Sequence, residues 1–288
     1  MQRVHITLAL LLLLGCAQAQ ENLQSLQEPL PENAVITTAP EPALASAAYK
    51  PIVWLQAPTI RPFITDDARV VGGRLAQVES WFRFDREAGQ QWALAAYGPH
   101  HKLELTIGGV AGYENAGNGK LAFSYALPLL QGKYLLREYA PGKGPGAAVV
   151  LGSFLPGGTG AFRPPGFGTF GFAIFTQCLG PHENVLIHAN VGANFLHIDG
   201  ANEWVQTWGL GTQVKTYKGF HLVGELFSGD PYLPGTGLSW QMGFRHIVSD
   251  RFQFDMTVGQ GIGGAKPLPF WFSGGIRMVS ERFLKRRR

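Results

Sequence analysis

The chain has 288 residues, of which 15% are charged and 12% are aromatic. Soluble domains carry about 25% charged residues, so this composition argues against an ordinary soluble enzyme. The formal net charge of +4 is matched by the last four residues, Lys285-Arg286-Arg287-Arg288. No aromatic residues are interleaved with them, so this basic end does not indicate nucleic-acid binding. We interpret it as a solvated terminus that contacts anionic lipid or lipopolysaccharide.

The N-terminal segment predicts export. A basic residue, Arg3, precedes the apolar run from Ile6 to Leu14, and Ala17-Gln18-Ala19 provides a small-x-small cleavage site. These are the three parts of a secretory signal peptide, which we place at residues 1–19. The apolar run is too short to cross a bilayer as a helix, and no later stretch reaches the roughly 18 apolar residues that a spanning helix needs.

The two cysteines leave one alternative open. Leu13-Leu14-Gly15-Cys16 resembles a lipobox, which would make Cys16 an acylated N-terminus, although we favour ordinary cleavage after Ala19. Cleavage there would leave Cys178 as the single cysteine, which excludes an intramolecular disulfide and a thiolate metal site. We expect Cys178 to act as a small apolar residue in a strand.

Residues 20–58 are rich in Glu, Gln, Pro and Ala and show no apolar periodicity. Such segments cannot bury enough apolar surface to fold, so we expect a disordered periplasmic lead. The folded domain is expected to cover residues 59–288.

From Arg74 onward, apolar and polar residues alternate with a period of two, as they do in a strand with one apolar face. Val78, Phe82 and Phe84, for example, alternate with the polar residues Gln77, Glu79, Arg83 and Asp85. An even number of such strands is expected in a single-chain bacterial barrel, because both chain ends then lie on the periplasmic side. The runs predict about twelve strands, near residues 75–85, 91–98, 102–114, 119–130, 144–155, 167–178, 183–196, 203–215, 217–228, 236–247, 250–262 and 268–279.

A soluble β-sandwich also alternates, but three further features favour an antiparallel transmembrane β-barrel. The runs are long, whereas globular strands centre on about 5–6 residues and membrane strands need about 9–11. The polar face is rich in Gly, Ser, Thr, Asn and Gln, which suits a water-filled lumen. Aromatic residues cluster at strand ends, where an interfacial girdle would lie. They are Trp81, Phe82, Phe84, Tyr113, Phe195, Trp204, Trp208, Phe270, Trp271 and Phe272.

The start of this domain resembles a known family. Arg61-Pro62-Phe63-Ile64-Thr65-Asp66-Asp67 is similar to the opening of the outer-membrane family named for a MetA-pathway of phenol degradation. A more diffuse likeness continues to about residue 279, including Asn190-Val191-Gly192 and the strand that contains Glu225. The resemblance implies a transporter-like barrel that passes small hydrophobic or aromatic compounds.

Charged residues on the polar face are the candidate site. Arg61, Asp66 and Asp67 could form a gating or ligand-orienting cluster, but we favour a structural plug or turn in which the aspartates accept from backbone amides. The inward-facing charges could select solutes or could pair across strands and occlude the lumen. They are Glu79, Arg83, Asp85, Lys102, Glu104, Lys120, Glu225, Arg245, Asp255 and Arg277. We expect a ladder of Glu225, Arg245 and Asp255 on three successive strands.

No motif predicts catalysis or a cofactor. Gly166-Phe167-Gly168-Thr169-Phe170-Gly171 matches G-x-G-x-x-G, but a loop leads into a strand there, so no dinucleotide site is expected. His100-His101 lacks a third metal ligand, and no nucleophile motif frames His188. We therefore predict a monomeric, non-enzymatic outer-membrane channel for small solutes. Its expected partners are membrane lipid, lipopolysaccharide and the barrel-assembly machinery. The alternatives are an outer-membrane lipid-modifying enzyme and a structural barrel with an occluded lumen.

Overall fold

The computed structural model describes residues 64–115, 120–164, 166–180, 183–198, 201–230, 233–264 and 267–280. All described residues belong to one compact unit, Trp54–Arg288. Arg61, Cys16, the predicted signal peptide and the predicted lead therefore lie outside the described residues, as does the basic C-terminal end.

The described part of the chain is built almost entirely of strands. No helix in it is long and apolar enough to span a membrane. The elements are β1 (Ala76–Asp85), β2 (Ala88–His100), β3 (Leu103–Asn115), β4 (Leu121–Arg137), β5 (Gly146–Phe154), β6 (Gly158–Thr159), η1 (Gly160–Phe162), β7 (Gly168–Leu179), β8 (Val185–Ile198), β9 (Ala201–Tyr217), β10 (Phe220–Asp230), β11 (Leu233–Ser249), β12 (Phe252–Gly261) and β13 (Trp271–Val279).

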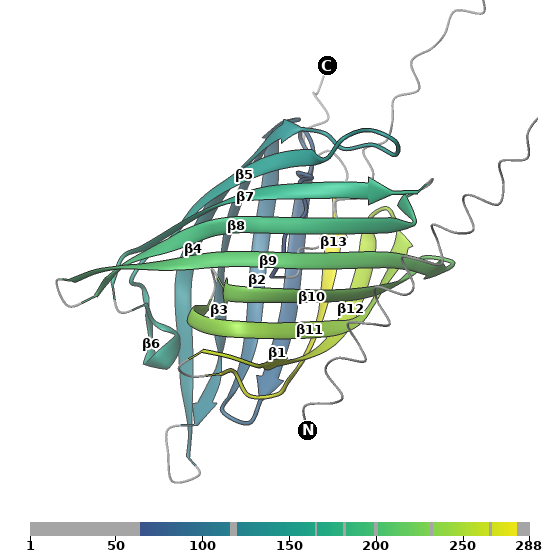
Figure 1. Cartoon of the computed structure of the whole chain (residues 1–288). Helices are drawn as coiled ribbons and strands as arrows, with labels where there is room; N and C mark the ends of the chain where they lie inside the picture. The colour runs from purple at the N-terminus through teal and green to yellow at the C-terminus, as the bar shows by residue number, and fades with distance from the viewer. Residues whose placement is uncertain are drawn as a thin grey trace, which may run out of the picture. The chain divides into compact units, whose positions relative to one another are not determined.

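Twelve strands close into an antiparallel barrel, which confirms the predicted fold and strand count. Each long strand pairs with its neighbours along the chain, and β5 pairs with β7. The ring closes where β1 pairs with β13, with Gln77 opposite Val279 and Phe84 opposite Phe272. In Figure 1, β7 to β11 run across the front of the barrel and β1 and β2 lie behind them. Closure removes the free sheet edges that would otherwise pair with other chains.

The two ends of the barrel differ in their connections. Ala76 and Val279 lie at one end, which we call the Ala76 end, and the opposite end is called the Asp85 end. The turns at residues 101–102, 218–219 and 250–251 are at the Ala76 end, whereas the two longest connections, residues 155–167 and 262–270, are at the Asp85 end.

β4 is longer than the sequence predicted. The sequence predicted a strand over residues 119–130, but β4 continues to Arg137. It contains Pro128, which cannot donate to a ladder. The register between β3 and β4 shifts between Gly108 and Val110, beside Pro128, so the missing donor falls at an irregularity. On the N-terminal side of Pro128, towards the Asp85 end, β6 pairs with β4, with Tyr125 opposite Thr159.

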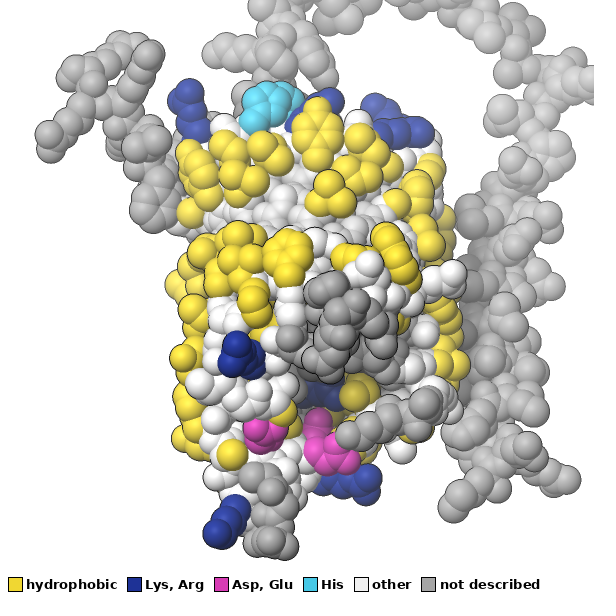
Figure 2. Space-filling view, turned by 90° about the vertical axis from the view of Figure 1, so that its left-hand side faces the viewer, with side chains coloured by type: hydrophobic (Ala, Val, Ile, Leu, Met, Phe, Trp, Pro, Cys, Tyr) yellow, Lys and Arg dark blue, Asp and Glu magenta, His cyan; other side chains and the backbone are white. Residues whose placement is uncertain are grey.

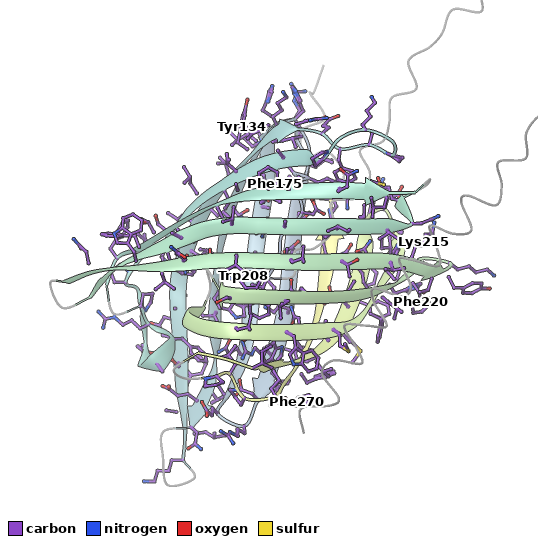
Figure 3. The ribbon with its side chains drawn as sticks, viewed as in Figure 1. Tyr134, Phe175, Trp208, Lys215, Phe220 and Phe270 are labelled. Atoms are coloured by element: carbon purple, nitrogen blue, oxygen red, sulfur yellow. The ribbon has the colours of Figure 1, made fainter. Side chains whose placement is uncertain are left out.

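The outer face of the barrel is apolar and solvent-exposed. Leu151 and Trp204 are 71% and 73% exposed, and many other large apolar side chains point outward. Figure 2 shows hydrophobic side chains spread over this face, with Lys, Arg and His at its upper edge and charged groups of both signs at its lower edge. Tyr134, Phe175 and Phe270 are among the outward side chains labelled in Figure 3.

Two aromatic residues were wrongly assigned to the outer girdle. Trp271 is 2% exposed and lies below the Arg83 guanidinium, whose Cζ is 4.4 Å from the ring centroid. Trp81 stacks on Trp92, with ring centroids 5.7 Å apart. Both side chains face inward, because they lie at the odd positions that alternate with the outward Phe82, Phe84 and Phe272.

The inner face is mostly polar over β1 and β9 to β13 and mixed over β2 to β8, where Glu104, Lys133 and Thr176 are buried beside apolar side chains. Buried polar groups face inward from β1 and from β9 to β13: Gln77, Glu79, Arg83, Thr207, Gln213, His221, Glu225, Ser239, Gln241, Arg245, Gln253, Asp255, Thr257 and Arg277. Buried apolar groups from β2, β4, β5 and β7 form a cluster opposite: Leu94, Leu129, Ala148, Val150, Phe170 and Ile174. The lumen is therefore partly packed, whereas the composition of the polar face favoured a water-filled lumen.

Candidate functional site

A stretch of chain before β1 lies inside the barrel. Residues 64–73, which we call the plug, are not part of any strand. Thr65, Asp66, Asp67 and Ala68 are at most 5% exposed, although the plug has no regular secondary structure. A buried irregular segment must find partners for its backbone groups, and here inward-facing strand side chains supply several of them.

Glu225 on β10 binds the start of the plug. The amide of Thr65 donates to Glu225 Oε2 (2.8 Å), and the amide of Ile64 donates to Glu225 Oε1 (3.1 Å). Gln241 on β11 also donates to this carboxylate. One buried carboxylate thus accepts from two consecutive plug amides, which are charge-assisted hydrogen bonds of the stronger kind.

Asp66 lies at the centre of the plug. Both of its carboxylate oxygens are 2.9 Å from Lys133 Nζ on β4. With its amide oriented so that both groups are satisfied, Asn190 on β8 accepts from the Asp66 amide (2.7 Å) and donates to the Asp66 carbonyl (3.1 Å). Lys133 and Asn190 therefore hold the same plug residue from two different strands.

Asp67 and Arg69 form a second charged pair. Asp67 accepts from the Arg69 amide (2.6 Å) and lies 3.2 Å from its guanidinium, which also approaches Glu183 at 3.5 Å. Burial raises the pKa of the Asp66 carboxyl to about 6, although the Lys133 charge opposes the shift. Burial acts on Asp67 in the same direction, but the charges of Arg69 and Lys133 outweigh it and lower the pKa of Asp67 to about 2.

The remainder of the plug crosses to the opposite wall. The amide of Ala68 donates to Thr176 Oγ1 on β7 (2.9 Å), and this hydroxyl shares a hydrogen bond with His188 Nδ1 (3.0 Å). The side chain of Ala68 packs into the apolar cluster of the lumen. Further on, the amide of Val71 donates to Glu104 Oε2 on β3 (2.7 Å). The plug therefore spans the lumen from β10 to β3.

Glycines in the wall make room for the plug. A Cβ at Gly209 on β9 would lie 2.5 Å from Thr65 Oγ1, and one at Gly98 on β2 would lie 1.9 Å from the Gly72 carbonyl oxygen. Both distances are too short for any side chain. The wall is therefore shaped to accept the plug at both ends.

The predicted site residues divide into two groups. Asp66 and Asp67 lie in the plug, and Glu104 and Glu225 bind it. Glu79, Arg83, Arg245, Asp255 and Arg277 lie buried on the mostly polar part of the inner face. Arg83 approaches Asp85 (3.6 Å), and Arg277 approaches Glu79 (4.0 Å).

The predicted Glu225–Arg245–Asp255 ladder is only half present. Arg245 is opposite Asp255 in the register of β11 and β12, with Nη2 and Oδ2 3.9 Å apart. Glu225 is opposite Gln241 and binds the plug. The inward assignment of Lys120 was wrong, because it is exposed and precedes β4.

Several plug-binding residues were not predicted. Lys133 was missed because the fourth strand was ended near residue 130. The alternation of Leu129, Gln131, Lys133 and Leu135 continues beyond Pro128 and could have identified it. Asn190 was named only as part of the family resemblance, and Thr176 carries no sequence signal of its own, because an isolated polar residue on a lumen face has many uses.

A hollow of about 970 Å³ lies on the wall over β3, β4, β5 and β7 to β9. The outward side chains of Leu105, Leu151 and Trp204 line it, and its floor reaches inward-facing Phe170. The outer positions Gly132 and Gly171 also line it, so no side chains thicken the wall there. The hollow is thus separated from the apolar cluster of the lumen by a thin wall.

Other motifs have structural roles. Cys178 is buried on β7 as a free cysteine, next to Leu186 in a small apolar cluster. The glycine-rich run at 166–171 leads into β7. Within the described ranges, no group of three or more His, Cys, Asp or Glu residues could hold a metal ion.

Comparison with known proteins identifies the fold. The sequence matches no family profile and no curated protein. The COG4313 outer membrane channel from Pseudomonas putida F1 is similar in structure, with a TM-score of 0.58 over 77% of this chain and 100% of that chain at 8% identity. The KdgM porin has a TM-score of 0.51 over 71% of this chain and 99% of that chain at 7% identity. This chain therefore has the fold of outer-membrane channel barrels.

Proposed function

We propose that this protein is an outer-membrane channel, and not an enzyme, that passes small hydrophobic or aromatic compounds when its plug is displaced. The observation that carries the proposal is the plug itself. Side-chain hydrogen bonds and the charged pairs Asp66–Lys133 and Arg69–Glu183 hold it to the barrel, and no strand pairing of residues 64–73 does. Each such bond contributes about 0.5–3 kcal/mol, so the plug can exchange between bound and released states while the barrel stays closed.

The outer face supports a membrane location. Exposed apolar side chains cover a closed barrel, and such a surface is stable only in an apolar solvent. Strands β2, β3 and β7 have 13, 13 and 12 residues, enough for tilted strands to cross a hydrocarbon layer. Because β1 begins and β13 ends at the Ala76 end, that end would be periplasmic and the Asp85 end extracellular.

The interior supports apolar solutes. The plug lies against an apolar cluster from β2, β4, β5 and β7, and Ala68 is part of that cluster. Release of the plug would expose this surface and not a uniformly polar pore. The hollow near Leu151 places a second apolar surface on the other side of the same wall.

The finer assignments belong to the same proposal. They are a signal peptide at residues 1–19, a periplasmic lead at residues 20–58, and membership of the family named for a MetA-pathway of phenol degradation. We also propose that the protein is a monomer surrounded by lipid and lipopolysaccharide and inserted by the barrel-assembly machinery.

A structural barrel with a permanently occluded lumen is the second candidate. The number of plug contacts favours it, because Glu225, Lys133, Thr176 and Glu104 all bind this segment, from four different strands. The two candidates differ in whether the plug is ever released.

Uptake by whole cells separates them. N-phenyl-1-naphthylamine is excluded by an intact lipopolysaccharide layer and fluoresces when it reaches phospholipid. Cells that produce the protein should take up this probe faster than cells without it, whereas proteoliposomes should swell little in arabinose. Fast swelling in arabinose would replace the proposal with an open polar pore. No uptake of either probe would leave a structural barrel.

A further inference from the structure

The long connection between β5 and β7 turns back to the Asp85-end half of β4, where β6 pairs with β4 and η1 follows. Residues 157–163, which we call the mouth loop, contain β6 and η1. Ser124 Oγ on β4 donates to the Thr159 carbonyl (2.9 Å) and accepts from the Phe162 amide (2.8 Å). Ser124 is fully buried and faces inward. The mouth loop is therefore held in two ways, by pairing of β6 with β4 in the sheet and by Ser124 on the inner face.

A second anchor comes from β3. The amide of Ala161 donates to Glu114 Oε1 (2.8 Å), so one turn of η1 is held by side chains from two strands. Gly160 allows this approach, because its φ is +67° and a Cβ there would lie 2.5 Å from Ser124 Oγ. A larger residue at Gly160 would push the mouth loop away from the wall.

Phe162 is the apolar contact of the mouth loop with the lumen. It packs on a buried cluster of Trp92, Val110 and Ala126. Trp81 and Phe154 pack against this cluster and also against the cluster that contains Ala68 of the plug. A continuous apolar path thus connects the mouth loop with the plug.

We propose that the mouth loop is a second gate at the Asp85 end, and that Phe162 makes this gate selective for apolar solutes. The inference rests on the proposed channel function and deepens it. A solute that enters here must replace the Phe162 side chain on Trp92, Val110 and Ala126. An apolar ring restores the buried contact, whereas a polar solute leaves its own groups without partners there.

A reversible disulfide tests the gate. Tyr125 and Thr159 are register partners, and cross-strand partners have the Cα separation that a disulfide requires. The variant Tyr125→Cys/Thr159→Cys would be made in a Cys16→Ala/Cys178→Ala background. Phe254→Cys/Ile276→Cys is the matched control, because it joins register partners on β12 and β13 away from the mouth loop.

The readout is uptake of N-phenyl-1-naphthylamine by cells before and after reduction. Uptake should fall at least about fivefold when the mouth-loop disulfide forms and should recover on reduction, with no change in the control. Equal uptake in both redox states would overturn the gate while the channel function stands. No uptake in either state would overturn the channel function, and the gate with it.

Substitution of Phe162 tests selectivity. Phe162→Ser should increase arabinose swelling relative to naphthylamine uptake by about fivefold, because the apolar contact no longer closes the mouth. Phe167→Ser is the control, since Phe167 lies just beyond the mouth loop and is 47% exposed. Retention of heat modifiability on gels would show that both variants fold. An unchanged ratio in Phe162→Ser would overturn the role of Phe162.

Discussion

The amide of Thr65 donates to the Glu225 carboxylate over 2.8 Å, although the two residues are 160 positions apart in the sequence. This bond connects the beginning of the domain to a strand on the far side of the barrel. The N-terminal side of the plug is held there, so its release would begin with loss of this contact. Glu225 is therefore the residue at which plug binding is most directly tested.

Replacement of Glu225 should release the plug. In Glu225→Gln the amide group brings its own donors toward the amides of Ile64 and Thr65, so two charge-assisted bonds, each worth about 1.5–3 kcal/mol, are weakened. Trypsin cannot reach Arg69 inside the lumen, so its cleavage there reports plug release. Cleavage after Arg69 should accelerate at least about tenfold in detergent-folded protein. Glu87→Gln, at an exposed turn, is the control, and equal rates in the two variants would contradict the role of Glu225.

A steric change should release the plug without altering charge. A side chain at Gly209 would collide with Thr65 Oγ1, whereas a Cβ at Gly224 on β10 would have its nearest neighbour at 3.8 Å. Gly209→Val should therefore expose Arg69 to trypsin, and Gly224→Val should not. Both variants place a β-branched residue in a strand, which strands accept well. Comparable protection in the two variants would show that the plug tolerates the collision.

The sequence predicted the barrel well because each strand repeats the same two-residue alternation. Val78, Phe82 and Phe84 face outward as their spacing required. The spacing could not show which inward residues meet, since a partner such as Gln241 for Glu225 depends on the register between strands. This is why the predicted Glu225–Arg245 contact is absent.

The plug could be suspected from sequence but not traced. Asp66 and Asp67 were interpreted as a plug or turn because paired aspartates bind backbone amides, yet the segment has no periodicity that fixes its path. Lys133 and Thr176 lie on distant strands, so only closure of the barrel brings them to Asp66 and Ala68. The apolar cluster of the lumen was likewise hidden, because it is assembled from a few residues on each of four strands.

Strong acid should loosen the plug. The pKa of Asp67 is lowered to about 2 from a reference of 3.8, so its stabilising effect is present above pH 3.8 and lost as the pH falls to about 2. The loss amounts to about 2 kcal/mol. Asp66 is already protonated in this range, since its pKa is about 6. The rate of peptic cleavage within residues 64–73, divided by the same rate in Asp67→Asn, should therefore rise as the pH falls from 4 to 2. A constant ratio would contradict the assignment.

Loss of a buried cation should destabilise the barrel wall. Arg277 is 2% exposed, donates to Gln77 Oε1 (2.7 Å) and lies 4.0 Å from Glu79. Arg277→Met would leave the Glu79 carboxylate buried without this cation, which costs about 3–5 kcal/mol. Urea unfolding in lipid vesicles, followed by tryptophan fluorescence, measures the loss. Arg251→Met, at an exposed turn between β11 and β12, should change stability by less than about 0.5 kcal/mol.

A charge on the outer face distinguishes a membrane barrel from a soluble one. Leu151 and Leu121 are 71% and 73% exposed, but Leu151 lies within β5 whereas Leu121 begins β4 at the Asp85 end. In a bilayer, Leu151→Arg should cost about 2–4 kcal/mol, and Leu121→Arg at most about 1 kcal/mol. In water both positions would be neutral, because a solvated arginine needs no partner. Urea unfolding of the two variants in vesicles decides the matter. Equal stabilities would contradict a membrane location, since depth in the hydrocarbon is the property in which the two leucines differ.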